Sequence, residues 1–197
     1  RLDAAKLQDE LRRLEFRSLL KQLPESMQVS QEVQAQHAHV SELVTGKIHV
    51  LKSAAQLRLE ADVPLVLHAR CSGKHGRDPQ VLIVSSSMAE TFVLDVKKIS
   101  KEEREHLQKV LNTRKIICFD TKADLKCMAE IGIKGLQVEH DIVVGAFLIN
   151  ALLRNSTLSD IARDAFGYEG DDFESIPTED LEHRAAEFTA VIRKLYE

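Results

Sequence analysis

Asp120 and Asp124 are the acidic residues of this sequence whose surroundings best suit chemistry. They follow a short apolar run, residues 116–119, whose pattern predicts a buried strand leading directly into a helix. A strand that delivers an acid to the mouth of a helix places it at the edge of a sheet, where carboxylate oxygens can bind a divalent metal ion. The pair therefore predicts a metal site, provided that other carboxylates lie beside it.

The same residues also fit a purely structural role. Asp124 follows Thr121 by three residues, which is the spacing of a capping box at the start of a helix. Asp120 and Asp141 stand just before predicted helices and would cap them in a similar way. We favour capping over metal binding for Asp124, because a metal site requires further ligands.

Two other groups of polar side chains lie close together in the sequence. His68, Cys71 and His75 have the residue types of a zinc site, but a fourth ligand is missing, so we interpret the spacing as coincidence. Lys74, His75 and Arg77 lie on a turn bounded by glycines that could contact a phosphate. A solvated hairpin tip is the better explanation for these basic residues.

The elements that must position these residues predict an α/β fold. Three strand-like runs separated by turns predict an antiparallel meander. A capping box formed by Ser100 and Glu103 opens a helix that ends near Asn112. This helix can return the chain, so that the strand at 116–119 lies parallel to the first strand of the meander. The three runs are Pro64–Cys71, Gln80–Ser85 and Thr91–Val96.

Further helices are predicted after the strand and helix around Asp124. Residues 142–153 are apolar nearly all round, which predicts a helix buried in the core. Residues 157–166 form an amphipathic pattern that ends at Gly167. Thr178 is predicted to cap a last helix that keeps one apolar face. The order of elements is that of an RNase H-like mixed sheet, with an antiparallel meander, parallel strands and flanking helices.

Composition and charge limit the possible functions. The 197 residues include 27 basic and 31 acidic side chains, and the net charge of −4 provides no overall attraction to a phosphate backbone. Without an apolar run long enough for a bilayer or a signal peptide, the sequence predicts a cytoplasmic protein. Cys71, Cys118 and Cys127 are scattered and odd in number, which predicts free thiols in a reducing compartment.

The beginning of the chain differs from the rest. Residues 2–23 form a charged amphipathic pattern that predicts a helical segment, and Pro24 ends it. Residues 25–46 are rich in Gln and lack Phe, Tyr and Trp, which predicts a linker. We therefore expect a helical segment at 1–24, a linker at 25–46 and a folded domain at 47–197.

Four stretches of the sequence, taken in order, resemble the motifs of one family. Residues 121–133 (TKADLKCMAEIGI) are similar to a second exonuclease motif in which an aromatic residue stands where this chain has alanine. Residues 140–150 (HDIVVGAFLIN) and 158–162 (LSDIA) resemble the two helices that follow that motif. The family is the 3′–5′ exonuclease domain of bacterial family A DNA polymerases (DNA polymerase I). Residues 14–25 look like the end of the 5′ nuclease domain that precedes it.

The resemblance implies a fold whose active members hold two Mg²⁺ or Mn²⁺ ions with carboxylates from three motifs. Asp124 matches the acid of the second motif. The first motif, Asp-x-Glu, falls on Ala69 and Cys71, or on His68 and Arg70 if the comparison slips by one residue. Neither pair contains a carboxylate.

The third motif, a helical Tyr-x-x-x-Asp, falls on Arg184 and Phe188. Glu187 is adjacent, but a step of one residue along a helix turns a side chain by about 100°. Asp124 is then the one matching acid, and a single carboxylate cannot hold two Mg²⁺ ions. The resemblance therefore implies a vestigial exonuclease domain without a metal or a catalytic residue, in which Phe188 fills the former metal position.

As a member of this family, the chain would belong to a DNA polymerase I that acts in DNA replication and repair. Its partners would be the polymerase and 5′ nuclease domains of the same polypeptide, and it would meet DNA through that enzyme, which uses Mg²⁺. We expect a monomer, and the sequence assigns no DNA-contacting residue. Two alternatives stay open. One is an active nuclease with Asp124, Asp120 and Glu187 as unusual ligands, and the other is a non-enzymatic interaction module.

Overall fold

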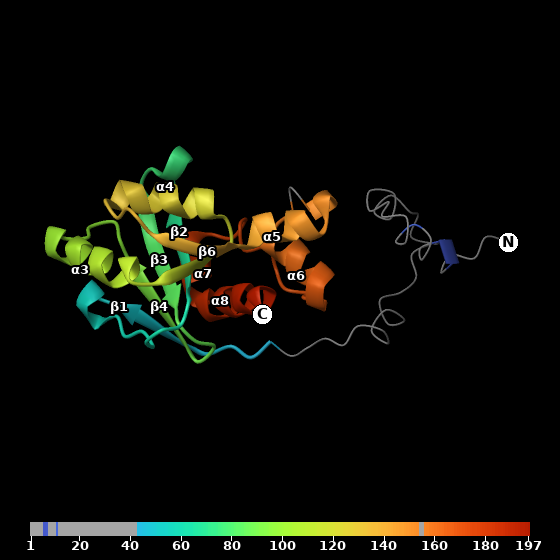
Figure 1. Cartoon of the computed structure of the whole chain (residues 1–197), viewed down its shortest axis with the longest axis horizontal. Helices are drawn as coiled ribbons and strands as arrows, with labels where there is room; N and C mark the ends of the chain where they lie inside the picture. Colours follow the sequence, from blue (N-terminus) through green and yellow to red (C-terminus); the bar gives the residue numbers. More distant parts are fainter. Residues whose placement is uncertain (1–5, 8–10, 12–42, 154–155) are drawn as a thin grey trace. The chain divides into compact units, whose positions relative to one another are not determined.

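The computed structural model describes residues 6–7, 11, 43–153 and 156–197 (Figure 1). The chain divides into two compact units, residues 1–40 and 41–197. The segment predicted to end a 5′ nuclease domain, residues 1–24, lies almost wholly outside the described residues, as does most of the linker predicted at 25–46. Those two assignments stay predictions, and the second unit is described below.

The described residues of the second unit form a six-stranded mixed sheet in the order β1-β4-β3-β2-β5-β6. As predicted, β2, β3 and β4 pair as an antiparallel meander. The prediction that the strand after the first long helix lies parallel to β2 is also confirmed, because β5 pairs with β2 in that direction. The strands are β1 Lys47–Leu51, β2 Leu65–Cys71, β3 Pro79–Ser85, β4 Glu90–Asp95, β5 Lys115–Cys118 and β6 Gln137–Asp141.

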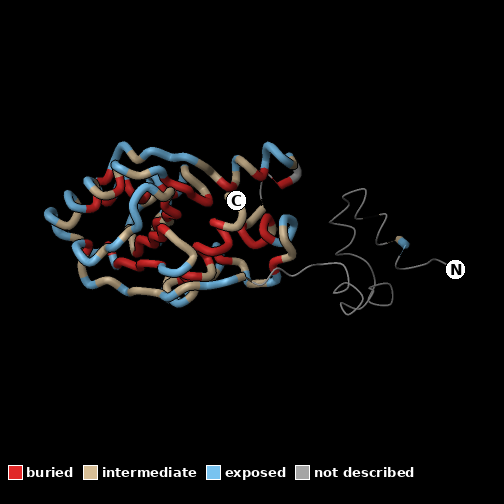
Figure 2. The backbone as a smooth tube through the Cα atoms, turned by 60° about the horizontal axis from the view of Figure 1, so that its bottom comes forward, coloured by how far each residue is buried: buried red, intermediate tan, exposed pale blue. Residues whose placement is uncertain are grey.

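Helices cover both faces of the sheet, with α4 and α8 on opposite sides in Figure 1. One core lies between the sheet, α3 and α4, and a second lies between the sheet and α5 to α8. Successive β2 residues alternate between them, since Leu65 and Leu67 join the first core and Val66 the second. The strand is therefore apolar on both faces, and Figure 2 shows buried segments through the middle of the domain.

Several helix ends follow the predicted local signals. Ser100 and Glu103 form the capping box of α3. Gly132 and Gly167 end α4 and α6 in the left-handed conformation that glycine adopts without steric cost. The helices are α3 Lys101–Asn112, α4 Thr121–Ile131, α5 Ile142–Ile149, α6 Leu158–Phe166, α7 Thr178–His183 and α8 Ala185–Tyr196, with 3₁₀ turns at Ala54–Gln56, Lys74–Gly76 and Ala151–Leu153.

The prediction of a helix that starts at Ile142 is confirmed, but its predicted extent to 153 and its predicted burial were wrong. Helix α5 ends at Ile149, and only its first turns contribute buried residues, Ile142 and Ala146. Leu148 and Ile149 are 77% and 89% exposed. An all-apolar sequence makes burial favourable but does not supply the neighbouring surface, and α5 meets the sheet only at its beginning.

The last helix is broken, although a single helix from Thr178 was predicted. Helices α7 and α8 meet at Arg184, whose backbone angles are φ −106° and ψ 12°. Pro177 precedes α7 without a side-chain cap, so the predicted cap at Thr178 was wrong. The apolar face survives the break because Leu181 and Phe188 are both buried.

The prediction of three free thiols was wrong. Cys71 and Cys127 form a disulfide whose Cα atoms lie 6.2 Å apart, and Cys118 is free and buried. The pairing joins the end of β2 to α4 across 56 residues of sequence. Only the packing of α4 against β2 brings these two residues together. Among the described residues, no helix has the length and apolar character that crossing a bilayer would require.

Candidate functional site

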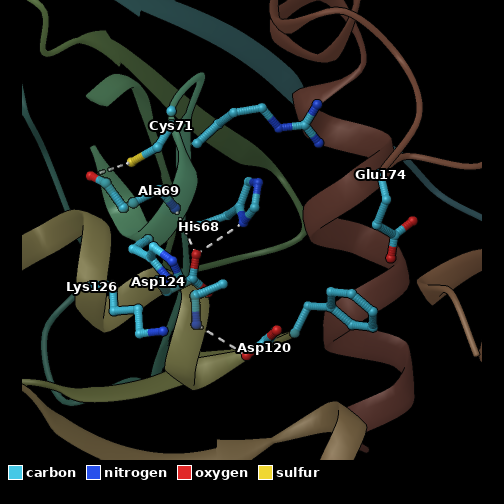
Figure 3. Close-up of a pocket in the computed structure, with 13 residues that line it drawn as sticks. His68, Ala69, Cys71, Asp120, Asp124, Lys126 and Glu174 are labelled. Atoms are coloured by element: carbon cyan, nitrogen blue, oxygen red, sulfur yellow. Dashed lines mark hydrogen bonds and ion pairs between the residues drawn. The ribbon is translucent and has the colours of Figure 1, made fainter. Parts of the chain in front are cut away.

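A cavity of about 510 Å³ lies between β2 and α4 (Figure 3). Its walls come from β2, the β2–β3 hairpin, the first turns of α4 and the loop before α7. It contains several of the residues that the sequence selected as candidates. The lining residues are His68, Ala69, Arg70, Cys71, Gly73, His75, Gly76, Phe119, Asp120, Ala123, Asp124, Lys126 and Glu174.

Asp124 connects α4 to β2 rather than capping its own helix. Its side chain is 1% exposed, and its Oδ1 accepts the Ala69 amide at 2.9 Å and lies 3.0 Å from Nδ1 of His68. The predicted capping box with Thr121 is therefore wrong. Asp120 is the N-cap of α4, because its side chain accepts the amide of Ala123 at 3.0 Å.

Asp141 also caps a helix, as predicted. One of its carboxylate oxygens accepts the Val144 amide at 2.9 Å, and the other accepts the Thr121 amide at the same distance. Asp141 thereby ties the start of α5 to the start of α4. The free thiol of Cys118 lies nearby, and burial raises its pKa, with a further contribution from the Asp124 carboxyl. This thiol therefore stays protonated.

The two faces of β2 separate the two possible matches to the first motif. Ala69 belongs to the core under α3 and α4, and Cys71 packs against that core. His68 projects to the opposite side, where its ring centroid lies 4.7 Å from that of Phe188. The pair at 68 and 70 therefore shares a face with the last helix, whereas the pair at 69 and 71 does not.

Arg70 is held by backbone carbonyls from the loop before α7. Its guanidinium donates to the oxygens of Phe173 at 2.7 Å and Ile176 at 2.8 Å. Burial lowers the pKa of this guanidinium, while Glu174 and Asp124 oppose the change. Even so, an arginine remains charged at any ordinary pH. A fixed positive charge therefore stands on the cleft side of β2.

The third-motif positions also carry structural contacts. Phe188 is 1% exposed and packs edge-on against Phe173, with ring centroids 5.3 Å apart. Arg184 donates to Glu187 at 2.8 Å and to Asp171 at 3.0 Å. The Tyr168 hydroxyl donates to the other oxygen of Glu187 at 2.6 Å. Burial would raise the pKa of Glu187, but the bonds from Arg184 and Tyr168 hold it below its ordinary value.

The contacts show whether the groups of residues considered as metal ligands lie together in the fold. Glu187 is bonded to Tyr168 and Arg184 and does not line the cleft with Asp120 and Asp124. Across residues 43–153 and 156–197, no three His, Cys, Asp or Glu side chains lie close enough together to hold a metal ion. The zinc pattern also fails, because the sulfur of Cys71 is bonded to Cys127.

Glu174 is a cleft residue that sequence reasoning missed. It comes from an acidic loop between α6 and α7, where no periodicity or cap signal points to the cleft. Burial raises its pKa to about 7, and a hydrogen bond with Asp172 adds to the rise. Its Oε1 accepts the Leu158 amide at 2.7 Å. By contrast, Lys74, His75 and Arg77 are exposed, which confirms the prediction of a solvated hairpin tip.

The mixed sheet with helices on both faces is a nuclease-like fold of the RNase H type. A solved structure of Brucella melitensis NrnC bound to pGG is 14% identical, with a TM-score of 0.54 and coverage of 78% of each chain. A structure titled "apo form of the nuclease" is 13% identical, with a TM-score of 0.53 and coverage of 79% of each chain. At such low identity, these likenesses show the fold alone.

A third likeness is to a polymerase. The structure of the POL domain of Pol1 from M. smegmatis, in complex with DNA primer-template and dNTP, is 18% identical with a TM-score of 0.53. The match covers 74% of this chain and 27% of the polymerase chain. No family model and no curated protein matches the sequence.

Proposed function

We propose that this chain is a catalytically silent exonuclease-like domain of a family A DNA polymerase, which it supports structurally. The proposal rests on the residue types at the positions where an active member of the family would have its carboxylates. His68 and Arg70 stand on the face of β2 that meets Phe188, and none of the three is an acid. In this assignment the first motif corresponds to residues 68 and 70.

The physical argument is one of charge. Two divalent ions close together require several carboxylates to offset their mutual repulsion. The cleft instead offers the fixed positive charge of Arg70, and Asp124 already binds the Ala69 amide and His68. A metal ion would have to displace these contacts. The other acids of the cleft are engaged elsewhere, because Asp120 caps α4 and Glu174 accepts the Leu158 amide.

The polymerase assignment draws on the sequence motifs and on the likeness to the M. smegmatis structure. In this proposal, the domain acts within an enzyme of DNA replication and repair in the cytoplasm. The polymerase and 5′ nuclease domains of the same polypeptide would be its partners, and DNA and Mg²⁺ would bind elsewhere in that enzyme. The reading frame of the full-length gene tests this directly, and a frame without polymerase motifs would contradict it.

The proposed lack of nuclease activity is tested with two DNA substrates, a labelled single strand and a primed duplex. Each is incubated with the protein and Mg²⁺ or Mn²⁺. We expect no metal-dependent shortening above that seen with heat-inactivated protein. Asp124→Ala is assayed in parallel, with Asp124→Asn as the matched control that keeps an oxygen facing the Ala69 amide. Shortening that requires the metal and disappears in both variants would show an active nuclease and overturn the proposal.

A further inference from the structure

The end of the β2–β3 hairpin forms one wall of the cleft, and α4 forms the wall beside it. Gly73, His75 and Gly76 line the cleft from the hairpin, and Ala123 and Lys126 line it from α4. The two walls are far apart in sequence. The shape of the cleft therefore depends on how firmly the hairpin tip, residues 72–78, is held against the helix.

The tip fits α4 closely but has an unfavourable backbone of its own. His75 and Asp78 have positive φ angles of 62° and 56°, which are uncommon for residues other than glycine. Gly76 has φ 86°, and a Cβ atom there would lie 2.6 Å from the Lys126 carbonyl carbon. The tip thus touches α4 through the bare backbone of a glycine.

Hydrogen bonds do not attach the tip to α4. Within the described part of the chain, the bonds made by residues 72–78 stay inside the hairpin or involve Gln80 of β3. The amides of Ser72 and Gly73 donate to the carbonyls of Asp78 and Arg77, at 3.1 and 3.0 Å. The side chain of Gln80 donates to Asp78 and Ser72. The Cys71–Cys127 disulfide is therefore the strong tie between the two walls.

We propose that this disulfide is a reversible redox latch of the cleft. In the oxidised state it holds the hairpin tip on α4. A dithiol reductant, small or protein-borne, breaks the S–S bond by supplying two electrons and two protons, and leaves as its own disulfide. The products are two thiols, and the tip then moves away from α4.

Both cysteines have a suitable place in the reduced state. Cys71 is half-buried and lines the cleft, so an attacking thiolate can reach its sulfur from there. That sulfur lies 3.1 Å from the Gly76 carbonyl oxygen, which can accept a bond from the freed thiol. Cys127 is 1% exposed in an apolar core, a common environment for a reduced cysteine.

Opening is confined to the tip because a second tie lies one turn away. Asp124 precedes Cys127 by three residues in α4 and binds the amide of Ala69, two residues before Cys71. This bond does not depend on redox state. It keeps the first turn of α4 on β2, so reduction frees residues 72–78 and leaves the sheet intact.

The test compares the oxidised and reduced wild-type chain by amide hydrogen exchange and by thiol counting. Under denaturing conditions, alkylation should modify one cysteine in the oxidised protein and three in the reduced protein. Reduction should accelerate exchange in residues 72–78 by about tenfold or more, the scale of a local opening transition. Exchange in β5 and in the first turn of α4 should stay unchanged.

Variants separate the latch from a general effect of the reductant. Cys71→Ser should exchange like the reduced protein under both conditions, whereas Cys118→Ser should retain the difference between them. If Cys71→Ser does not fold, the comparison of oxidised and reduced wild-type protein still tests the proposal. The proposal is overturned if air-oxidised protein contains three alkylatable thiols, if the two states exchange alike at 72–78, or if reduction unfolds the whole domain.

Discussion

The two faces of β2 stabilise the same strand in different ways. On the α4 side, specific bonds act: the Asp124 carboxylate binds the Ala69 amide, and Cys71 is joined to Cys127. On the α8 side, the rings of His68 and Phe188 pack at a tilt, with centroids 4.7 Å apart. Bonds that span 55 and 56 residues join α4 to β2, whereas a ring contact joins Phe188 of α8 to the same strand.

The comparison shows that two different kinds of contact hold β2 beside the cleft. On one side, Oδ1 of Asp124 accepts a backbone amide, and on the other the buried Phe188 ring packs against His68. The effects of substitutions on stability should therefore differ between the two faces, both in size and in pH dependence. The following tests are ordered from the largest expected effect to the smallest.

Replacing Phe188 with alanine should have the largest effect on stability. The ring is fully buried, and truncating a buried aromatic residue typically costs about 3–5 kcal/mol. Urea denaturation followed by circular dichroism measures the free energy of unfolding. Phe147→Ala is the matched control, since that ring is 40% exposed on α5, and it should cost about 1 kcal/mol. Equal losses would show that α8 does not depend on this contact.

Asp124→Ala should rank second, with a loss of about 3 kcal/mol, because it leaves a buried amide and an imidazole without their acceptor. Asp124→Asn should recover part of that loss by accepting the Ala69 amide bond. Asp120→Ala serves as the comparison on the same helix and should cost about 1 kcal/mol, as expected for an N-cap. A smaller effect at Asp124 than at Asp120 would contradict the role of Asp124 as a tie between α4 and β2.

Arg70→Met should cost about 2 kcal/mol, since two carbonyl oxygens lose a charged donor. The same change at the exposed Arg77 should stay within about 0.5 kcal/mol. Chemical denaturation of both variants provides the measurement. Similar losses at the two positions would mean that Arg70 does not fasten the loop before α7.

Glu174 should produce a small pH dependence. Its pKa is raised to about 7 from the ordinary 4.5, so the folded state binds the proton more tightly than the unfolded state does. Its contribution to stability is therefore present below pH 4.5 and is lost as the pH rises from 4.5 through 7. Melting temperatures measured across this range should fall less steeply in Glu174→Gln than in the wild type. If the melting temperatures of the two proteins change in parallel with pH, Glu174 is not the source of the pH dependence.

Much of the architecture follows from the sequence alone, because the signals for single elements are local. The capping box of Ser100 and Glu103, the caps at Asp120 and Asp141, and the glycine ends of α4 and α6 all depend on residues a few positions apart. The apolar runs and the crossover helix were sufficient to predict the meander and the parallel strand beside β2.

The tertiary structure decided the rest, because those features depend on partners distant in the sequence. The acid at 124 looked like a cap, yet its hydrogen bonds go to the neighbouring strand. Cysteines that seemed free meet only when α4 packs on β2, and the apolar helix α5 is exposed because no described element covers its last turns. Residue types and periods encode local geometry, whereas pairing and burial depend on the surfaces that folding brings together.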